Sequence, residues 1–132
     1  MIFVDTGAWF AAFVPNDPDH GAADAWLARN TEPLTTTDYV LDELLTLLKR
    51  RGEFERSLRL GQSILDCEIA QLEWITPADV EAAWGVFRRF RDKGWSFTDC
   101  TSRVVIDRLS IPTAFALDQH FRQFGNVTVV PS

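Results

Sequence analysis

Short apolar runs alternate with longer stretches of helical periodicity along this chain. The runs have the length and the β-branched or aromatic content that is typical of strands. They cover residues 1–4, 34–37, 69–75, 113–117 and 127–130. Because neighbouring parallel strands must be joined by crossovers, most often helices, this alternation predicts an α/β fold. We expect a three-layer α/β/α sandwich with a central parallel sheet.

The stretches between the runs carry the signals of helix starts and stops. One helix is expected from Asp38, as its N-cap, to Gly52, with leucines at the spacing of one helix face. A later helix is expected from Pro77 to Gly94, behind a capping box at Thr76. Its buried stripe is expected to consist of Val80, Ala83, Trp84, Phe87 and Phe90. Further helices are expected over about residues 8–14, 19–30, 54–66 and 99–109, with residues 95–97 extended.

The composition is that of one compact domain. The chain has 132 residues, 46% hydrophobic and 24% charged, so we expect a single domain over residues 1–132 with one packed core. Its longest apolar run, residues 8–14, is too short for a membrane span, and the N-terminus does not resemble a secretory signal. The two cysteines, Cys67 and Cys100, have no metal-like spacing and indicate no disulfide framework. These features favour a cytoplasmic protein without a membrane partner.

Charge is distributed unevenly. The net charge is −6, which argues against binding nucleic acid through bulk electrostatics. Residues 1–43 hold eight acids and one base, however, so the rest of the chain is close to neutral. Two basic clusters lie in that part, at residues 49–59 and 88–93. Each cluster alone is most simply a solvated helix end.

Three acids stand at or just beyond the ends of predicted extended segments: Asp5, Asp99 and Asp118. The carboxyl ends of parallel strands line the ligand crevice of an open sheet, so we expect these three carboxylates to converge at one edge. A single Asp in such a place is more often a helix cap, and Asp99 could simply cap its helix. Three together favour a site.

Glu43 is the fourth candidate. A capping box from Asp38 would place its carboxylate at the position of Leu41, so capping does not account for Glu43. Helical geometry puts Glu43 at the rim of the leucine stripe, a place that favours a cleft over open solvent. Four carboxylates held close together repel one another, and a cation relieves that repulsion. Oxygen-only ligands favour Mg²⁺ or Mn²⁺, which support phosphodiester hydrolysis.

The sequence lacks the motifs of other common reaction mechanisms. The chain has no phosphate-binding glycine loop, no H-E-x-x-H and no G-x-S-x-G. A two-histidine ribonuclease mechanism would need His20 and His120 to meet, and each is expected in a loop as a surface or capping residue. Receiver domains carry paired acids after the first strand, and haloacid-dehalogenase-type phosphatases carry D-x-D there; this chain has Asp5-Thr6-Gly7.

Four segments in order resemble the signature segments of PIN-domain nucleases, and among these the VapC-type toxins of toxin–antitoxin modules. They are DTGAW at 5–9, DELLTLLKRRG at 42–52, SFTDCTS at 96–102 and ALDQHF at 116–121. The resemblance spans essentially the whole chain and implies a five-stranded parallel sheet. It also implies a metal-dependent endoribonuclease of structured RNA, such as transfer or ribosomal RNA, with its acidic quartet at Asp5, Glu43, Asp99 and Asp118.

Partners follow from the same resemblance. The basic clusters become candidate phosphate contacts, with Arg50, Arg51, Arg88 and Arg89 as candidate RNA-binding residues. Residues 8–14 are apolar nearly all round, which a core position largely explains, but the resemblance implies a groove there for an antitoxin, and a homodimer through other helices. Two alternatives stay open: a PIN nuclease with a housekeeping role in RNA maturation, and a catalytically inactive RNA- or protein-binding module.

Overall fold

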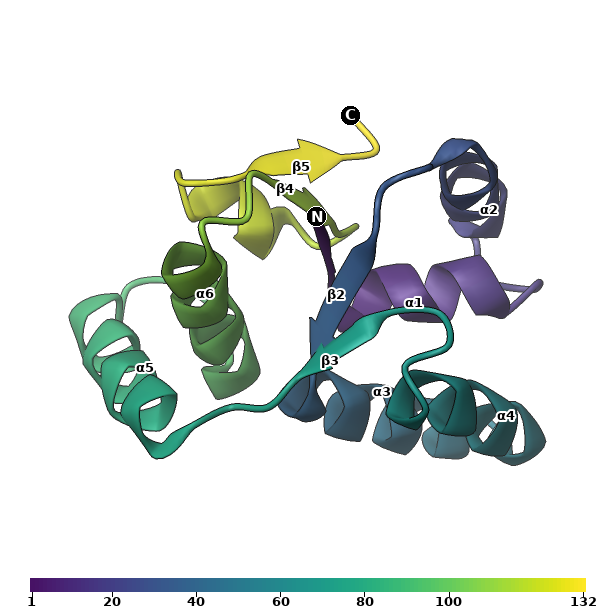
Figure 1. Ribbon diagram of the computed structural model, residues 1–132, viewed down its shortest axis with the longest axis horizontal. Helices are drawn as coiled ribbons and strands as arrows, with labels where there is room; N and C mark the ends of the chain where they lie inside the picture. Colours follow the sequence, from purple (N-terminus) through teal and green to yellow (C-terminus); the bar gives the residue numbers. More distant parts are fainter.

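The computed structural model describes all 132 residues, with one sheet of parallel strands in the order β3-β2-β1-β4-β5 (Figure 1). The strands are β1 (Ile2–Val4), β2 (Leu34–Thr37), β3 (Gln71–Glu73), β4 (Thr113–Phe115) and β5 (Thr128–Val130). β1 lies in the middle, paired with β2 on one side and β4 on the other. The chain winds outward from β1 to β3 and then crosses back to β4, so the strand order reverses between β1 and β4. The predicted parallel α/β sandwich is confirmed.

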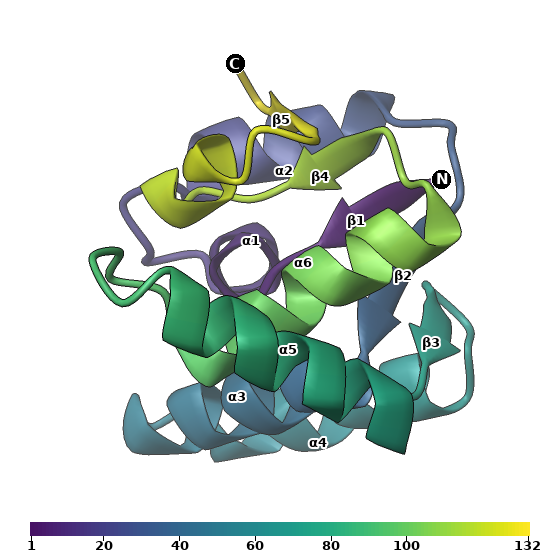
Figure 2. The same ribbon diagram turned by 90° about the vertical axis from the view of Figure 1, so that its left-hand side faces the viewer.

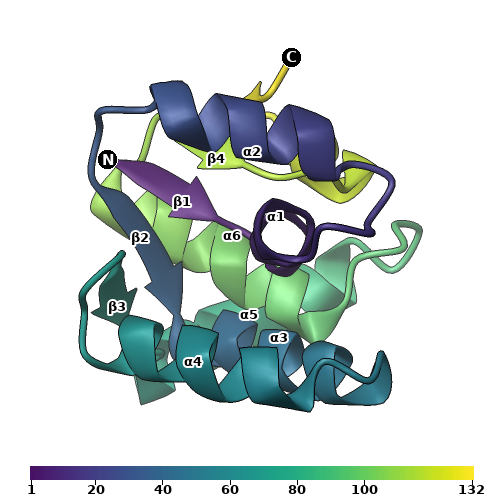
Figure 3. The same ribbon diagram turned by 90° about the vertical axis from the view of Figure 1, so that its right-hand side faces the viewer.

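Helices cover both faces of the sheet. They are α1 (Thr6–Phe13), α2 (His20–Arg29), α3 (Asp38–Arg50), α4 (Phe54–Leu65), α5 (Pro77–Arg89), α6 (Phe97–Leu109) and the 3-10 helix η1 (Gln119–Gln123). α5 and α6 lie on one side (Figure 2), and α1, α2 and α4 lie on the other (Figure 3). α3 packs against both α4 and α6. Right-handed crossovers require this split once the strand order reverses. No helix is both long and apolar enough to cross a membrane.

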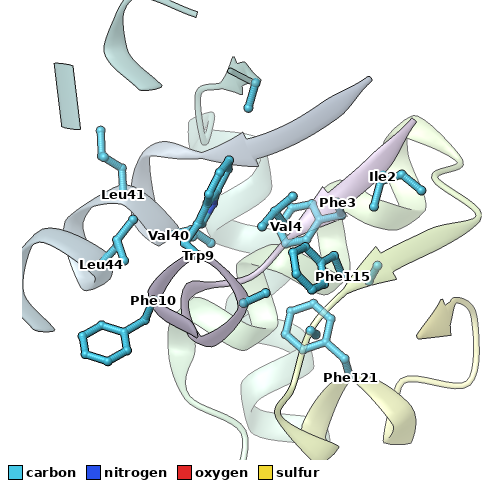
Figure 4. Packing of buried hydrophobic residues seen from close by; sticks show 14 of the residues in the cluster. Ile2, Phe3, Val4, Trp9, Phe10, Val40, Leu41, Leu44, Phe115 and Phe121 are labelled. Carbon is cyan, nitrogen blue, oxygen red and sulfur yellow. The ribbon is translucent and has the colours of Figure 1, made fainter. Parts of the chain in front are cut away.

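A single cluster of 30 buried hydrophobic residues forms the core, and Figure 4 shows its side chains gathered around β1. The Phe3 ring of β1 stacks on Phe121 of η1, with centroids 6.0 Å apart. On α1, the Trp9 indole N–H donates to the Thr36 hydroxyl at 3.2 Å, and that hydroxyl donates to the Val4 carbonyl at 3.0 Å. These bonds satisfy polar groups that would otherwise be costly to bury, and they fix α1 against the end of β1.

α1 is covered by its own chain. It packs against α2 and α3, and Trp9 and Phe10 are buried. The sheet and two helices therefore cover the apolar sides of α1, as a core position predicts, and where an antitoxin would bind stays a prediction. The large apolar side chains that reach solvent lie mainly on α4 and α5.

The start of α3 differs from the sequence prediction. Its N-cap is Thr37, whose hydroxyl accepts from the Val40 N–H at 3.1 Å. The Asp38 carboxylate instead accepts from the Ile75 N–H at 2.7 Å, so it ties α3 to the segment after β3. Asp38 can do this because β2 and β3 are neighbours, a relation that only the tertiary structure creates.

α5 is shorter and turned differently than predicted. It ends at Arg89, not Gly94, and residues 95–97 form no strand. Trp84 and Phe87, expected in the buried stripe, are 53% and 41% exposed. The reason is an ion pair: the Arg108 guanidinium of α6 donates to both carboxylate oxygens of Asp79, each at 2.9 Å. This pair sets the face that α5 turns towards α6, so Ala83 is buried and the two aromatic rings are not.

Candidate active site

The four acids from the sequence analysis line one cavity of about 520 Å³. It lies at the carboxyl ends of β1 and β4, where the strand order reverses. Ligand sites of open α/β sheets form at such a switch point, because the loops from adjacent strands diverge there. The structure therefore brings Asp5, Glu43, Asp99 and Asp118 together as expected. Their catalytic and metal-binding roles stay a prediction.

Asp5 lies deepest in the cavity. It directly follows β1 and is the N-cap residue of α1, but its carboxylate makes no capping hydrogen bond. The side chain is buried, with the residue 4% exposed, and Oδ1 has no hydrogen-bond partner. Burial raises the pKa of Asp5 to about 8, the Thr6 backbone N–H opposes that rise, and the charges of Asp99, Glu43 and Asp118 add to it. An orphaned buried oxygen among like charges is a position suited to a cation.

Asp99 reaches the cavity by a different route than predicted. It follows no strand; it is the third residue of α6 and completes a capping box with Ser96, in which both reciprocal bonds are 3.0 Å long. Asp99 therefore both caps α6 and lines the cavity. Burial raises the pKa of Asp99, hydrogen bonds from Ser96 and His120 lower it, and the charge of Asp118 raises it, with a net shift upward.

Glu43 enters from the side of α3, half-buried at the rim of the leucine stripe as predicted. Its Oε1 accepts a 2.5 Å hydrogen bond from the Thr6 hydroxyl. Thr6 also lines the cavity and was not singled out in the sequence. Its position directly after Asp5 is the signal that could have identified it, because a residue at the start of α1 faces the same strand ends.

His120 also lines the cavity, so its expected role as a surface or capping residue is wrong. Its Nδ1 lies 3.0 Å from Asp99 Oδ2 and 3.3 Å from Asp118 Oδ2. Its backbone N–H donates to Asp118 Oδ1 at 2.9 Å. His20, by contrast, places Nδ1 2.8 Å from the Ala11 carbonyl, so it caps the end of α1 as expected and does not line the cavity.

The candidate RNA-binding arginines lie in three different places. Arg50 lines the acidic cavity. Arg51 sits over the Phe10 ring, 5.7 Å from its centroid, and does not line that cavity. Arg88 and Arg89 line a separate hollow on the outside of α5. The structure thus places one of the four beside the acids, and contact with RNA stays a prediction for all of them.

The oxygen atoms that line the cavity are the kind of ligand that a hard cation prefers, although the side chains do not converge on a single point. The polar side chains that could ligate a cation all present oxygen atoms apart from His120, and Asp42 adds a fifth carboxylate to the lining. No group of three or more His, Cys, Asp or Glu side chains is arranged to hold an ion directly. Mg²⁺ usually binds through one or two carboxylates and keeps several waters, so this spacing fits an ion held partly through water.

Known proteins resemble this chain in sequence and in fold. The PIN domain family model matches residues 2–127. The 23S rRNA-specific endonuclease VapC20 of Mycobacterium tuberculosis is 34% identical over 99% of both chains. Its crystal structure, described as that of a sarcin-ricin loop cleaving toxin, superimposes with a TM-score of 0.91 over 99% of this chain and 100% of that one.

Two further proteins are more distant. Ribonuclease VapC26 of the same organism is 26% identical, over 98% of this chain and 100% of its own length. A toxin-antitoxin complex from Klebsiella pneumoniae matches with a TM-score of 0.64 at 8% identity, over 90% of this chain and 88% of that one. The second likeness shows the fold alone.

Proposed function

We propose that this chain, which belongs to the PIN-domain family, is an endoribonuclease toxin that is inhibited by a cognate antitoxin. Its reaction is hydrolysis of phosphodiester bonds in structured RNA, ribosomal or transfer RNA. The observation that carries the proposal is the buried Asp5 carboxylate, whose Oδ1 has no hydrogen-bond partner, in one cavity with three further acids. The similarity to VapC20 along nearly the whole chain supports the choice of substrate class and of antitoxin control. We also propose that residues 1–132 are one domain that acts in the cytoplasm.

Mg²⁺, with Mn²⁺ as its substitute, is the proposed cofactor, held by Asp5, Glu43, Asp99 and Asp118. A bound divalent ion polarises a phosphoryl oxygen and lowers the pKa of a coordinated water. The chain itself positions the ligands: the Thr6 hydroxyl orients Glu43, and His120 lies against both Asp99 and Asp118. Arg50 lies in the same cavity, where a guanidinium can bind a phosphate in a bidentate manner.

The antitoxin has an apolar surface available on this chain. Phe54, Leu58 and Leu65 of α4 are exposed, and they line a shallow hollow of about 280 Å³ between α3 and α4. An amphipathic antitoxin helix would bury these side chains. We also propose that the protein forms a homodimer. Sedimentation of the purified protein tests this oligomeric state.

The proposed activity can be tested directly. Purified protein is incubated with ribosomal and with transfer RNA, in Mg²⁺ and in EDTA, and the new RNA ends are mapped. We expect cleavage at few positions, in Mg²⁺ only. Asp118→Asn should abolish cleavage, whereas Asp24→Asn, on the exposed surface of α2, should not. Cleavage that survives EDTA would refute the metal assignment, and no cleavage of any RNA by the parent would refute the function.

A further inference from the structure

The His120 imidazole touches two of the four acids in the cavity. Its Nδ1 lies 3.0 Å from Asp99 Oδ2 and 3.3 Å from Asp118 Oδ2. Asp99 lies in the first turn of α6 and Asp118 is the N-cap of η1, so the ring joins two elements. A carboxylate oxygen accepts hydrogen bonds, so we assign the ring hydrogen that faces the acids to Nδ1. The contact with Asp99 is then a charge-assisted hydrogen bond.

The fold holds this ring in place from both sides. On one side, the His120 backbone N–H donates to Asp118 Oδ1 at 2.9 Å. The next residue, Phe121, is buried and stacks on the Phe3 ring of β1, so it anchors η1 to the core. On the other side, a β carbon built on Gly94 would lie 3.3 Å from His120 Nε2. The imidazole is therefore fixed between the loop after α5 and the two carboxylates.

The hydrogen bonds of Asp99 decide which of its two oxygens is free. The Ser96 backbone N–H and His120 Nδ1 both bind Oδ2, each at 3.0 Å. A carboxylate oxygen offers about two lone-pair sites, so these two donors occupy Oδ2. Oδ1 is then the oxygen of Asp99 that can bind a cation. The same Nδ1–H also lies between Asp99 and Asp118, two like charges that repel each other, so it allows them to stay close.

We propose that His120 is a positioning residue of the acidic site: its Nδ1–H holds Asp99 beside Asp118 and leaves Asp99 Oδ1 free for a divalent cation. The inference rests on the proposed metal-dependent nuclease and names the group that orients two of its ligands. Partners that donate hydrogen bonds to ligating carboxylates orient them, and losing such a partner typically costs roughly 10- to 100-fold in metal affinity or activity. His120 acts here through the two carboxylates and makes no contact with the ion.

The test measures binding of Mn²⁺ to the purified protein, followed by the electron paramagnetic resonance signal of the free ion. His120→Leu removes both ring nitrogens and should weaken Mn²⁺ binding by roughly 10- to 100-fold. His120→Asn returns an N–H donor at the position of Nδ1 and should recover most of that affinity. His120→Gln returns a donor near the position of Nε2 and should not. A role in folding alone would not distinguish the Asn variant from the Gln variant.

Two further variants serve as controls. The matched histidine is His20, whose Nδ1 lies 2.8 Å from the Ala11 carbonyl oxygen, outside the cavity. His20→Leu should bind Mn²⁺ as the parent does. Gly94→Ala displaces the His120 ring without removing any of its atoms, so it should weaken Mn²⁺ binding. The same change should have little effect in the His120→Asn protein, because Asn has no atom at the position of Nε2. This pair of results decides the proposal even if His120→Leu does not fold.

Three results would overturn the positioning role. In the first, His120→Leu binds Mn²⁺ as tightly as the parent does. In the second, His120→Gln recovers binding and His120→Asn does not, which assigns the effect to Nε2. In the third, His120→Leu binds Mn²⁺ more tightly, which means that the imidazole competes with the ion. None of these results touches the proposed nuclease, because the parent would still cleave RNA in a manner that depends on Asp118.

The proposed function can fail separately. A parent that binds Mn²⁺ with this dependence on His120 but cleaves no RNA would remove the nuclease and leave the positioning role in place. A parent that binds no Mn²⁺ would remove the metal site, and the positioning role with it, whatever its cleavage of RNA shows.

Discussion

Gly94 leaves room for the imidazole of His120. A β carbon built on Gly94 would lie 3.3 Å from His120 Nε2, closer than an ordinary van der Waals contact. The opposite ring nitrogen, Nδ1, is the atom within 3.3 Å of Asp118 and Asp99. The loop after α5 therefore controls the position of a side chain that lies against two carboxylates from two other elements.

We expect Gly94→Ala to lower nuclease activity with little effect on stability. The added methyl group must displace the His120 ring by a few tenths of an ångström, and active-site geometry is sensitive to shifts of this order. Initial cleavage rates and thermal melts of the variant measure the two effects. The control is Gly21→Ala in α2, where a β carbon meets nothing within 4 Å. Equal activity of both variants would show that the His120 position does not matter.

Thr6→Val should reduce kcat more than it reduces folding stability. The substitution keeps the shape of the side chain but removes the hydroxyl that donates to Glu43 at 2.5 Å. Hydrogen bonds to charged groups contribute about 1.5–3 kcal/mol, so a loss of orientation should slow cleavage roughly 10- to 100-fold. Thr46→Val is the matched control, since Thr46 lines the same cavity without a bond to Glu43. If both variants slow cleavage equally, the Thr6–Glu43 bond is not the cause.

The empty acidic site should destabilise the protein as pH rises. The pKa of Asp5 is about 8 in the folded state because the group is buried among like charges, against 3.8 for the free side chain. The unfolded chain then releases this proton first, so the contribution of Asp5 to stability is greatest below about pH 4 and is lost progressively up to about pH 8. Asp5→Asn should raise the melting temperature in EDTA at pH 8 and change it much less at pH 4. A melting temperature that falls in the variant at pH 8 would contradict this assignment.

Mg²⁺ should reverse that destabilisation in the parent and not in Asp5→Asn. A ligand that binds only the folded state stabilises it by about 2.7 kcal/mol at a hundredfold excess over Kd. Binding should strengthen between pH 6 and about pH 8 as Asp5 loses its proton. Melts with a series of Mg²⁺ concentrations at several pH values give both quantities. An equal gain in parent and variant would exclude Asp5 as a ligand.

Arg108→Met should destabilise the fold by about 1–3 kcal/mol, a value kept low because Arg108 is partly exposed. The substitution leaves the buried Asp79 carboxylate with only the hydrogen bond that it accepts from the Thr76 backbone N–H. A double-mutant cycle of Arg108→Met and Asp79→Asn, measured by unfolding in urea, gives the interaction energy of the pair. Because Arg108 holds the pKa of Asp79 below its usual value despite burial, the stability from the pair is present above about pH 4 and lost as pH falls through the folded pKa. Additive effects of the two substitutions would mean that the pair contributes nothing.

The sequence by itself determined the strands, the helices between them and the place of two acids in the site. Strand and helix periodicities are local, so they can be read without knowing what packs against what. Asp5 and Asp118 follow β1 and β4, and the ends of adjacent parallel strands must meet at one edge. Glu43 was identified because its helix face could be computed from leucine spacing alone.

Only the tertiary structure decided which way each surface turned and which other side chains joined the acids. The stripe on α5 was misread because its rotation depends on the pair between Asp79 and Arg108, which are 29 residues apart in sequence. Asp99 lines the cavity from the first turn of α6 and not from a strand end. The sequence shows the local capping box, but it does not show which other elements lie next to that turn. His120 became part of the site because η1 folds back towards the start of α6, a non-local contact that no periodicity records.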